Sequence, residues 1–113
     1  MDCIFCKIVA GEIPSAKVYE DDRILAFKDI NPCAPVHTII IPKDHSITCC
    51  NDITEENAEI VAYIFSKIPH IAKLCGTEEG YRIVNNCGAL GAQSVFHIHF
   101  HLIGGTQLSE KLN

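Results

Sequence analysis

The sequence predicts an α+β fold built on a mostly antiparallel sheet of five strands, with one long helix and a short N-terminal helix. Short β-rich runs alternate with clusters of Gly, Pro, Asn and Asp, which is typical of strands joined by turns. One long segment, residues 52–75, carries apolar residues at helical spacing. The stretch HIHFHLI, residues 97–103, has a His at every second position, as expected of a strand with two different faces.

The N-terminal segment, residues 3–13, is interpreted as a short helix. Gly11 ends it, because Gly tolerates the left-handed conformation that follows many helices, and Pro14 prevents its continuation. Residues 16–30 then contain two β-rich runs separated by the polar residues 20–22. This pattern predicts a hairpin of two antiparallel strands.

A third strand is predicted within residues 36–45, with a β-branched centre at residues 38–41 and an end at Pro42. Residues 81–86 and 94–103 are predicted to form the fourth and fifth strands, joined by a Gly-rich loop. The row of imidazoles therefore lies on a sheet rather than on a helix.

The long helix is expected to begin near Asp52, which is a suitable N-cap with Glu55 three residues later. Gly76 is its expected end. Pro69 lies inside the pattern and lacks a backbone N–H, so it predicts a kink, with a break into two helices as the alternative. The apolar stripe consists of Ile60, Val61, Ile64, Phe65, Ile68, Ile71, Ala72 and Cys75.

Length and composition indicate a single domain spanning residues 1–113. A net charge of −5 argues against binding a nucleic acid polymer through a basic surface. No stretch approaches the roughly 18 apolar residues of a membrane span, and no secretory signal is evident. Seven Cys, an odd number, indicate reduced thiols or metal ligands, so we expect a cytoplasmic protein without a membrane partner.

The imidazole row allows three interpretations. A single His in a strand commonly does no chemistry, but three in strict alternation are hard to ascribe to chance. Imidazoles two residues apart on a strand can bind one metal ion. They can also supply a nucleophile, a proton donor and a hydrogen-bond anchor together, because His titrates near neutral pH.

The loop before this strand favours phosphoryl chemistry. Residues 88–92 are mostly small, so their backbone N–H groups can face an anion. Asn86, Gln93 and Ser94 add side-chain donors. A Gly-rich turn alone is weak evidence, whereas one that leads directly into the imidazole row predicts a phosphate pocket.

Cys3 and Cys6 form a C-x2-C pair. Spacing alone allows a zinc site, a redox pair or two buried thiols. A thioredoxin-like redox role would place the pair after a strand in a βαβ unit, and the N-terminal sequence has no such unit. The redox interpretation is therefore disfavoured.

The segment QSVFHIHFHLI, residues 93–103, resembles the His-φ-His-φ-His-φ-φ signature of the histidine triad (HIT) hydrolases and nucleotidyl transferases, where φ is apolar. Residues 3–45 resemble the N-terminal half of the Hint branch of that family, so the resemblance covers nearly the whole chain. A third His at residue 101 differs from the galactose-1-phosphate uridylyltransferase branch, which has Gln there. The chain is therefore interpreted as Hint-like.

The resemblance implies the catalytic roles. His99 is expected to attack the α-phosphorus of a nucleotide, and His101 and His37 to hold the phosphate. Ser94 and Gln93 are expected to flank the leaving group, and Asn86 to lie beside the site. Which group protonates the leaving group stays open, and no catalytic metal is required. The expected nucleotide-binding set is Phe5, Ile8, Phe27, Asp29, Ile30, Asn86, Gln93, Ser94, His99 and His101.

Within that set the resemblance implies a slot for a purine nucleoside. The apolar members are expected to contact the base, and Asp29 to accept hydrogen bonds from the ribose hydroxyls. Two structural alternatives stand beside this expectation. Phe27 alternates with Leu25 and suits an ordinary core position, while Asp29 before Asn31 and Pro32 suits a turn.

The resemblance also implies one structural zinc ion per chain. Its ligands would be Cys3, Cys6, His45 and His97, against the alternative of two buried thiols. Residue 92 is Ala where relatives typically carry Gly, which we expect to strain the loop. Family members are homodimers with joined sheets, so a homodimer is expected.

The expected function is hydrolysis of purine nucleoside phosphoramidates or related nucleotidyl conjugates, with release of a nucleoside monophosphate from a nucleotidyl-histidine intermediate. The alternatives are hydrolysis of dinucleoside polyphosphates, or nucleotide binding by a zinc-stabilised protein with little turnover.

Overall fold

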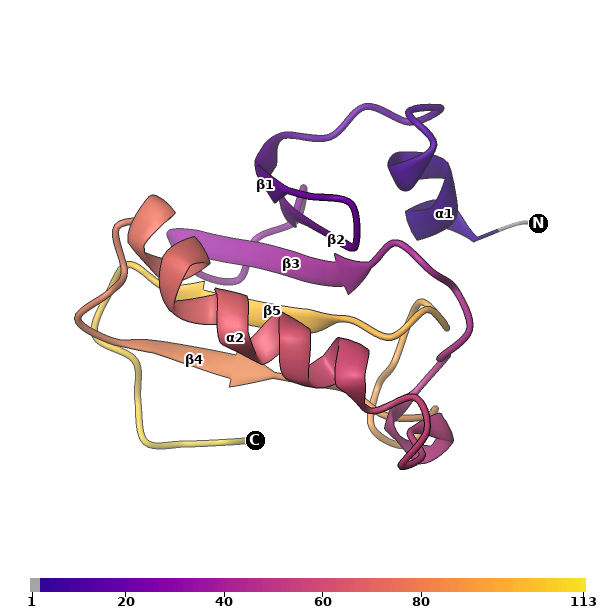
Figure 1. The fold of residues 1–113 in the computed structure, drawn as a ribbon. Coiled ribbons are helices and arrows are strands. Elements are labelled where there is room, and N and C mark those ends of the chain that lie inside the picture. The colour runs from indigo at the N-terminus through magenta and orange to yellow at the C-terminus, as the bar shows by residue number, and fades with distance from the viewer. Residues whose placement is uncertain (1–2) are drawn as a thin grey trace.

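A computed structural model describes residues 3–113 and contains one antiparallel five-stranded sheet of strand order β1-β2-β3-β5-β4 (Figure 1). Every pair of neighbouring strands is antiparallel. This confirms the predicted α+β class. The strands are β1 (Lys17–Glu20), β2 (Ile24–Lys28), β3 (Val36–Pro42), β4 (Tyr81–Val84) and β5 (Phe100–Gly104).

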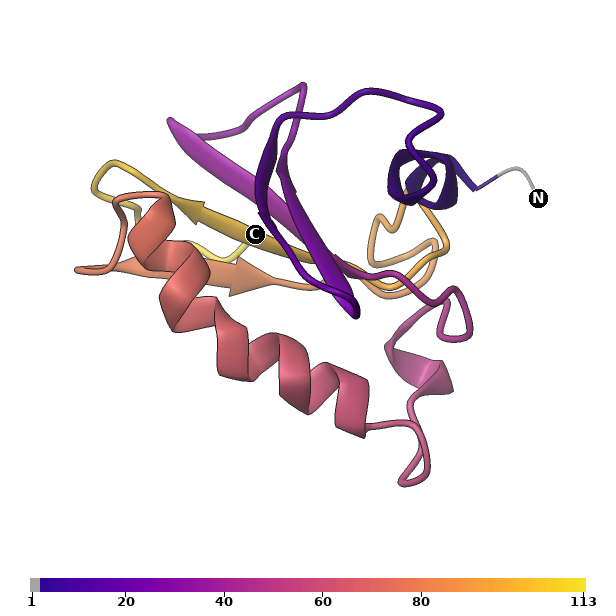
Figure 2. The ribbon, with the colours of Figure 1, turned by 45° about the horizontal axis from the view of Figure 1, so that its top comes forward.

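The two helices contact opposite faces of this sheet. The long helix α2 (Glu59–Leu74) covers one face, and the short helix α1 (Ile4–Val9) lies beyond the other face (Figure 2). Because side chains alternate along a strand, the central strands supply two separate apolar clusters. Ile40 and Leu102 pack with α2, while Ile39 and Ile41 pack with α1.

The predicted N-terminal helix and hairpin are confirmed. Cys3 caps α1, because its sulfur accepts a hydrogen bond from the N–H of Cys6, and Gly11 has a positive φ of 81°. In the hairpin, Asp21 accepts hydrogen bonds from the hydroxyls of Tyr19 and Tyr63 at 2.7 and 2.5 Å. Tyr63 belongs to α2, so Asp21 ties the hairpin to the long helix.

The predicted start of the long helix at Asp52 is wrong. A 3-10 turn, η1 (Cys50–Asp52), comes first, and α2 begins at Glu59. The Asp52 carboxylate accepts a hydrogen bond from the hydroxyl of Thr48 instead of capping α2. Local side-chain bonds of this kind compete with helix formation, which explains the later start.

The helix α2 continues through Pro69 to Leu74, so the alternative of a break into two helices is wrong. Pro69 is exposed, and its ring lies on the side of the helix that faces away from the sheet core. The expected end of the helix is confirmed, because Gly76 has a φ of 74° and its N–H donates to the carbonyl of Lys73.

The fifth strand is shorter than predicted, because β5 begins at Phe100 rather than at Ser94. The partner strands explain the difference: pairing with β3 ends at Phe100, and pairing with β4 ends at His101. The fourth strand likewise ends at Val84 rather than at residue 86. Within residues 3–113, no helix has both the length and the apolar character needed to cross a membrane.

Candidate active site

The side chain of His99 is fixed by one hydrogen bond. Its Nδ1 lies 2.9 Å from the carbonyl oxygen of His97, so Nδ1 carries the proton and donates to that oxygen. The other ring nitrogen, Nε2, therefore holds a lone pair. His99 is 3% exposed, and Phe5 packs edge-to-face against its ring with 5.0 Å between ring centroids. A buried imidazole in this tautomer has the properties of a nucleophile.

His37 and His101 form a second hydrogen-bonded unit. The N–H of Cys33 donates to Nδ1 of His37 at 3.1 Å, so the His37 proton lies on Nε2. That nitrogen is 2.8 Å from Nδ1 of His101 and 3.4 Å from Oδ2 of Asp29. Nδ1 of His101 is therefore an acceptor, and its Nε2–H is a donor. The triad positions 99 and 101 thus carry complementary tautomers.

Burial favours the neutral form of His99 and of His101. It lowers the pKa of His99 below the ordinary value. Burial, helped by the neighbouring rings of His99 and His37, lowers the pKa of His101 to about 4. Near pH 7 the site accordingly offers a lone pair on His99 and an N–H donor on His101 without placing a positive charge on either ring.

A cavity of about 250 Å³ opens in front of these two imidazoles, between α1 and the sheet. It is lined by most of the residues that the sequence predicted to bind a nucleotide, including Ile30 at an exposed position. Predicted residues that line it are Phe5, Ile8, Phe27, Asp29, Ile30, Ser94, His99 and His101.

Asn86 and Gln93 do not line this cavity. The Asn86 amide donates to the carbonyl of Gly91 at 2.8 Å. The Gln93 amide donates to the carbonyls of Thr48 and Val95, at 2.6 and 3.0 Å, and its oxygen accepts from Gly88. In this structure their side-chain donors hold the loop together. The expected places of Gln93 beside the leaving group and of Asn86 beside the site stay predictions.

The loop is tight at its centre. A side chain at Gly91 would place Cβ 2.3 Å from the carbonyl oxygen of Cys87. Ala92 has a φ of 64°, which makes it the one non-Gly residue with positive φ among residues 3–113. The predicted strain at residue 92 is therefore confirmed, because this region disfavours a residue with a Cβ.

Sequence reasoning missed several residues that line the cavity. Ile39 and Val95 extend its apolar wall, and Ser15 adds a hydroxyl whose oxygen is buried without a hydrogen-bond partner in the described chain. Alternation along β3 could have identified Ile39. It lies on the same face as Ile41, and Ile40 lies on the opposite face. The full set of missed residues is Ile4, Ile13, Pro14, Ser15, Lys28, Ile39 and Val95.

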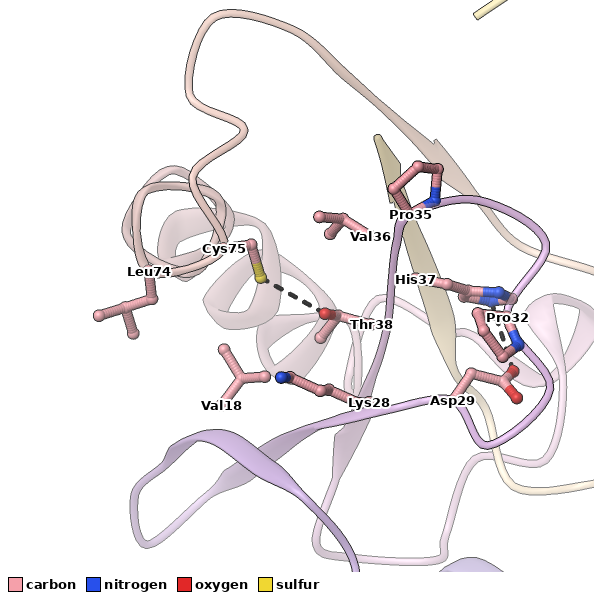
Figure 3. Close-up of a pocket in the computed structure, with 10 residues that line it drawn as sticks. All are labelled: Val18, Lys28, Asp29, Pro32, Pro35, Val36, His37, Thr38, Leu74 and Cys75. Carbon is pink, nitrogen blue, oxygen red and sulfur yellow. Dashed lines mark hydrogen bonds and ion pairs between the residues drawn. The ribbon is translucent and has the colours of Figure 1, made fainter. Parts of the chain in front are cut away.

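Asp29 and His37 line a second cavity of about 250 Å³. This cavity extends across β3 toward the end of α2, where the hydroxyl of Thr38 lies 3.4 Å from the sulfur of Cys75 (Figure 3). Asp29 lines both cavities, and its Oδ2 lies 3.4 Å from Nε2 of His37. Figure 3 shows the two side chains facing each other.

The four predicted metal ligands lie together. The ligand atoms of Cys3, Cys6, His45 and His97 are all within 4.8 Å of one another. Nδ1 of His97 lies 3.4 Å from the sulfur of Cys3 and 3.6 Å from that of Cys6, while Nδ1 of His45 lies 2.9 Å from Cys6. The ligand atoms of tetrahedral zinc lie about 3.3–3.8 Å apart. The donor set and its spacing therefore fit zinc.

A further hydrogen bond prepares His97 for this role. Its Nε2 donates to the carbonyl of Pro42 at 2.7 Å, which leaves the lone pair on Nδ1, the atom that faces the thiols.

The ligand atoms of a second group, Asp29, His37 and His101, also lie within 4.8 Å of one another. There the bond from the N–H of Cys33 keeps a proton on Nε2 of His37, so that nitrogen is not available to a metal.

Comparison with known proteins agrees with this arrangement. A family model described as "Scavenger mRNA decapping enzyme C-term binding" matches residues 2–112. The chain is 50% identical to a 14 kDa zinc-binding protein of Zea mays over 94% of this chain and 84% of that protein. It is 47% identical to adenylylsulfatase HINT1 of Arabidopsis thaliana over 94% of this chain and 73% of that protein.

Solved structures show the same fold. A histidine triad protein from Clostridium difficile is 50% identical, with a TM-score of 0.92 and coverage of 98% of this chain and 96% of that one. A HIT family hydrolase from Clostridium thermocellum is 47% identical, with a TM-score of 0.94 and coverage of 99% and 97%. Sequence, fold and the arrangement of the three imidazoles agree: this chain belongs to the histidine triad (HIT) family.

Proposed function

We propose that the protein hydrolyses purine nucleoside phosphoramidates and related nucleotidyl conjugates, and releases a nucleoside monophosphate. The observation that carries this proposal is the tautomer of His99. Its Nδ1 is bonded to a backbone carbonyl, so the lone pair lies on Nε2 beside a cavity with an apolar wall. The family includes hydrolases, among them the structure from Clostridium thermocellum.

The reaction has two displacements. In the first, Nε2 of His99 forms a bond to the α-phosphorus while the bond from phosphorus to the leaving amine breaks, and the amine takes up a proton. In the second, water attacks the phosphorus and gives up a proton, which balances the one taken up by the amine, while the bond to His99 breaks and the monophosphate leaves. The Nε2–H of His101 donates to a phosphate oxygen, a role supported by the acceptor state of its Nδ1.

The nucleoside occupies the cavity with its base against the rings of Phe5 and Phe27, which lie 5.6 Å apart between centroids in an edge-to-face contact. Oδ1 of Asp29 accepts the N–H of Asn31 at 2.7 Å, so this residue does shape the turn. The second oxygen, Oδ2, accepts from the ribose hydroxyls in this proposal. Asp29 would then serve both as a turn residue and as a ligand contact.

The direct test is release of AMP from an adenosine phosphoramidate by the wild type and by the His99→Ala variant. We expect loss of turnover in the variant with retained binding of AMP, because the cavity keeps its apolar wall. His70→Ala, on the exposed face of α2, is the matched control and should keep the wild-type rate. Equal turnover by His99→Ala and the wild type would contradict the role of His99, and absence of turnover in both would leave only the nucleotide-binding alternative.

A second candidate reaction is hydrolysis of adenylyl sulfate, favoured by the name of the Arabidopsis relative. Dinucleoside polyphosphates are a third substrate class, since the same nucleophile serves all three and only the leaving group differs. The values of kcat/KM on one conjugate of each class rank them. A preference of at least about tenfold for the phosphoramidate would support the first proposal.

We also propose one structural zinc ion per chain, bound by Cys3, Cys6, His45 and His97. Four protein ligands leave no open position for water, so the ion would hold α1 against the triad segment rather than act on substrate. Its contribution to folding would be on the order of 10 kcal/mol. Metal analysis should give one zinc per chain in the wild type and much less in Cys3→Ser; a value near zero in the wild type would refute the site.

We propose further that the protein is a homodimer in the cytoplasm. β4 is an edge strand, so its unpaired side is open to a second copy that would extend the sheet. Phe65 on α2 is 47% exposed and adds apolar surface. Light scattering on the purified protein should give twice the mass of one chain, whereas the mass of a monomer would overturn this assembly.

A further inference from the structure

The backbone of His99 lies just outside the regular sheet. The last residue of β4, Val84, pairs with His101, and β5 itself begins at Phe100. Asn85 follows directly in the chain, and its Nδ2 donates to the carbonyl oxygen of His99 at 2.9 Å. A side-chain amide thus supplies the hydrogen bond that a longer strand would have supplied.

The orientation of this amide is set by a thiol. Cys50, in the turn η1, donates from Sγ to Oδ1 of Asn85 at 2.8 Å. Because the oxygen of Asn85 faces a donor, its nitrogen must face the carbonyl of His99. Burial, together with the nearby thiols of Cys87 and Cys49, raises the pKa of Cys50, which keeps the proton that this bond requires.

We propose that Cys50 and Asn85 are positioning residues for the nucleophile, acting through the chain of hydrogen bonds from Cys50 to Asn85 to His99. The inference rests on the proposed function. The ring of His99 is anchored at Nδ1 by the carbonyl of His97, and its backbone is anchored at its own carbonyl by Asn85. The two anchors together set where Nε2 points.

Removing the second anchor should reduce turnover more than binding. The Asn85→Asp variant keeps the shape of the side chain but cannot donate to the carbonyl of His99. We expect kcat to fall by about tenfold or more, because small displacements of a reacting atom slow a reaction strongly, while KM and the affinity for AMP stay within about twofold. Wild-type kcat in Asn85→Asp would overturn the proposal.

Substitutions at Cys50 provide a rescue test. Cys50→Ser retains a donor for Oδ1 of Asn85 and should keep kcat within about twofold, whereas Cys50→Ala should lose as much as Asn85→Asp. Cys75→Ala is the matched control, since this half-buried thiol bonds to Thr38 away from His99. Equal kcat in Cys50→Ala and Cys50→Ser, or an equal loss in Cys75→Ala, would contradict a specific role of Cys50.

A spectroscopic measurement separates this proposal from the proposed function. The ¹⁵N spectrum of the His99 ring should report a single Nδ1–H tautomer in the wild type and in Cys50→Ser, and a mixture in Asn85→Asp and Cys50→Ala. Absence of turnover in the wild type would reject the function alone. Unchanged ring spectra in both disruptive variants would reject the positioning chain, whether or not the protein turns over.

Discussion

The backbone of Ala92 is held in a conformation that suits glycine. A left-handed φ costs about 1–2 kcal/mol for a residue with a Cβ, and Gly removes this strain. Gly also increases the conformational freedom of the unfolded chain, which lowers stability by roughly 0.5–1 kcal/mol. We therefore expect Ala92→Gly to raise the free energy of unfolding by about 0.5–1 kcal/mol. Denaturant unfolding measures the change.

Ala89 provides the control for this prediction. It lies in the same loop but does not have a positive φ. Ala89→Gly should give no stabilisation, because it only adds freedom to the unfolded chain. An equal gain from the two substitutions would mean that the strain at Ala92 does not affect stability.

The lowered pKa of His101 predicts how stability changes with pH. In the unfolded chain this imidazole titrates near 6.5, and in the native protein it titrates at about 4. Between these values the unfolded state binds a proton that the native state does not, so stability falls as the pH falls from 6.5 toward 4. We expect His101→Gln to lose less stability than the wild type between pH 7 and pH 5.

The wild type and His101→Gln share all their other titrating groups. The difference between their losses of stability therefore reports on His101 alone. Unfolding curves of wild type and His101→Gln at the two pH values provide it. Identical losses of stability would show that His101 is not buried as a neutral imidazole in the native state.

Individual site residues were predictable where one local pattern set their direction. Alternation along the last strand placed His99 and His101 on one face, and the cysteine spacing placed two of the proposed zinc ligands on one turn. The bonds of Gln93 were not predictable, because its partner Thr48 is distant in sequence. Sequence shows which residues can donate a hydrogen bond, but not which acceptors the fold brings near.

The helix α2 contains Pro69 in its fourth turn, where proline removes the N–H that would bond to the carbonyl of Phe65. Pro69 is exposed, so replacement removes no core contact. We expect Pro69→Ala to stabilise the protein by between about 1 and 3 kcal/mol. Pro32→Ala is the control, because Pro32 lies in a loop and its replacement restores no helical hydrogen bond. If Pro69→Ala does not raise the free energy of unfolding more than Pro32→Ala, the prediction is wrong.

Elements were predicted well in type and less well in extent. The hairpin and β3 agree with the sequence, because polar turns and β-branched runs are local signals. The starts of α2 and β5 do not agree. The start of β5 depends on strands that are distant in sequence, because its pairing with β3 and β4 begins at residues 100 and 101. The start of α2 is delayed because the side chains of Asp52 and Asn57 accept hydrogen bonds that hold the preceding residues in turns.

Across the molecule, the four proposed zinc ligands and the cavity beside His99 are linked through one helix. Cys3 and Cys6 lie at the start of α1, while Phe5 and Ile8 of the same helix line the cavity. Zinc would therefore hold one wall of the binding site without touching a phosphate. The placement of Phe5 and Ile8 in the cavity wall would then depend on zinc-stabilised folding of the N-terminal segment.

This coupling predicts that removal of zinc weakens nucleotide binding. Treatment with a chelator should lower both the melting temperature and the affinity for AMP, and addition of zinc should restore both. Calorimetry on the same preparation measures the two changes. Loss of metal with unchanged AMP affinity would show that α1 keeps its place without the ion.

The proposed reaction depends on a transient bond between Nε2 of His99 and phosphorus. Rapid quenching of the wild type with a nucleotide conjugate labelled at the α-phosphate, followed by peptide mapping, tests it most directly. We expect label on the peptide that contains His99, formed and lost at rates compatible with turnover, and none in His99→Ala. Turnover without label on His99 would contradict it.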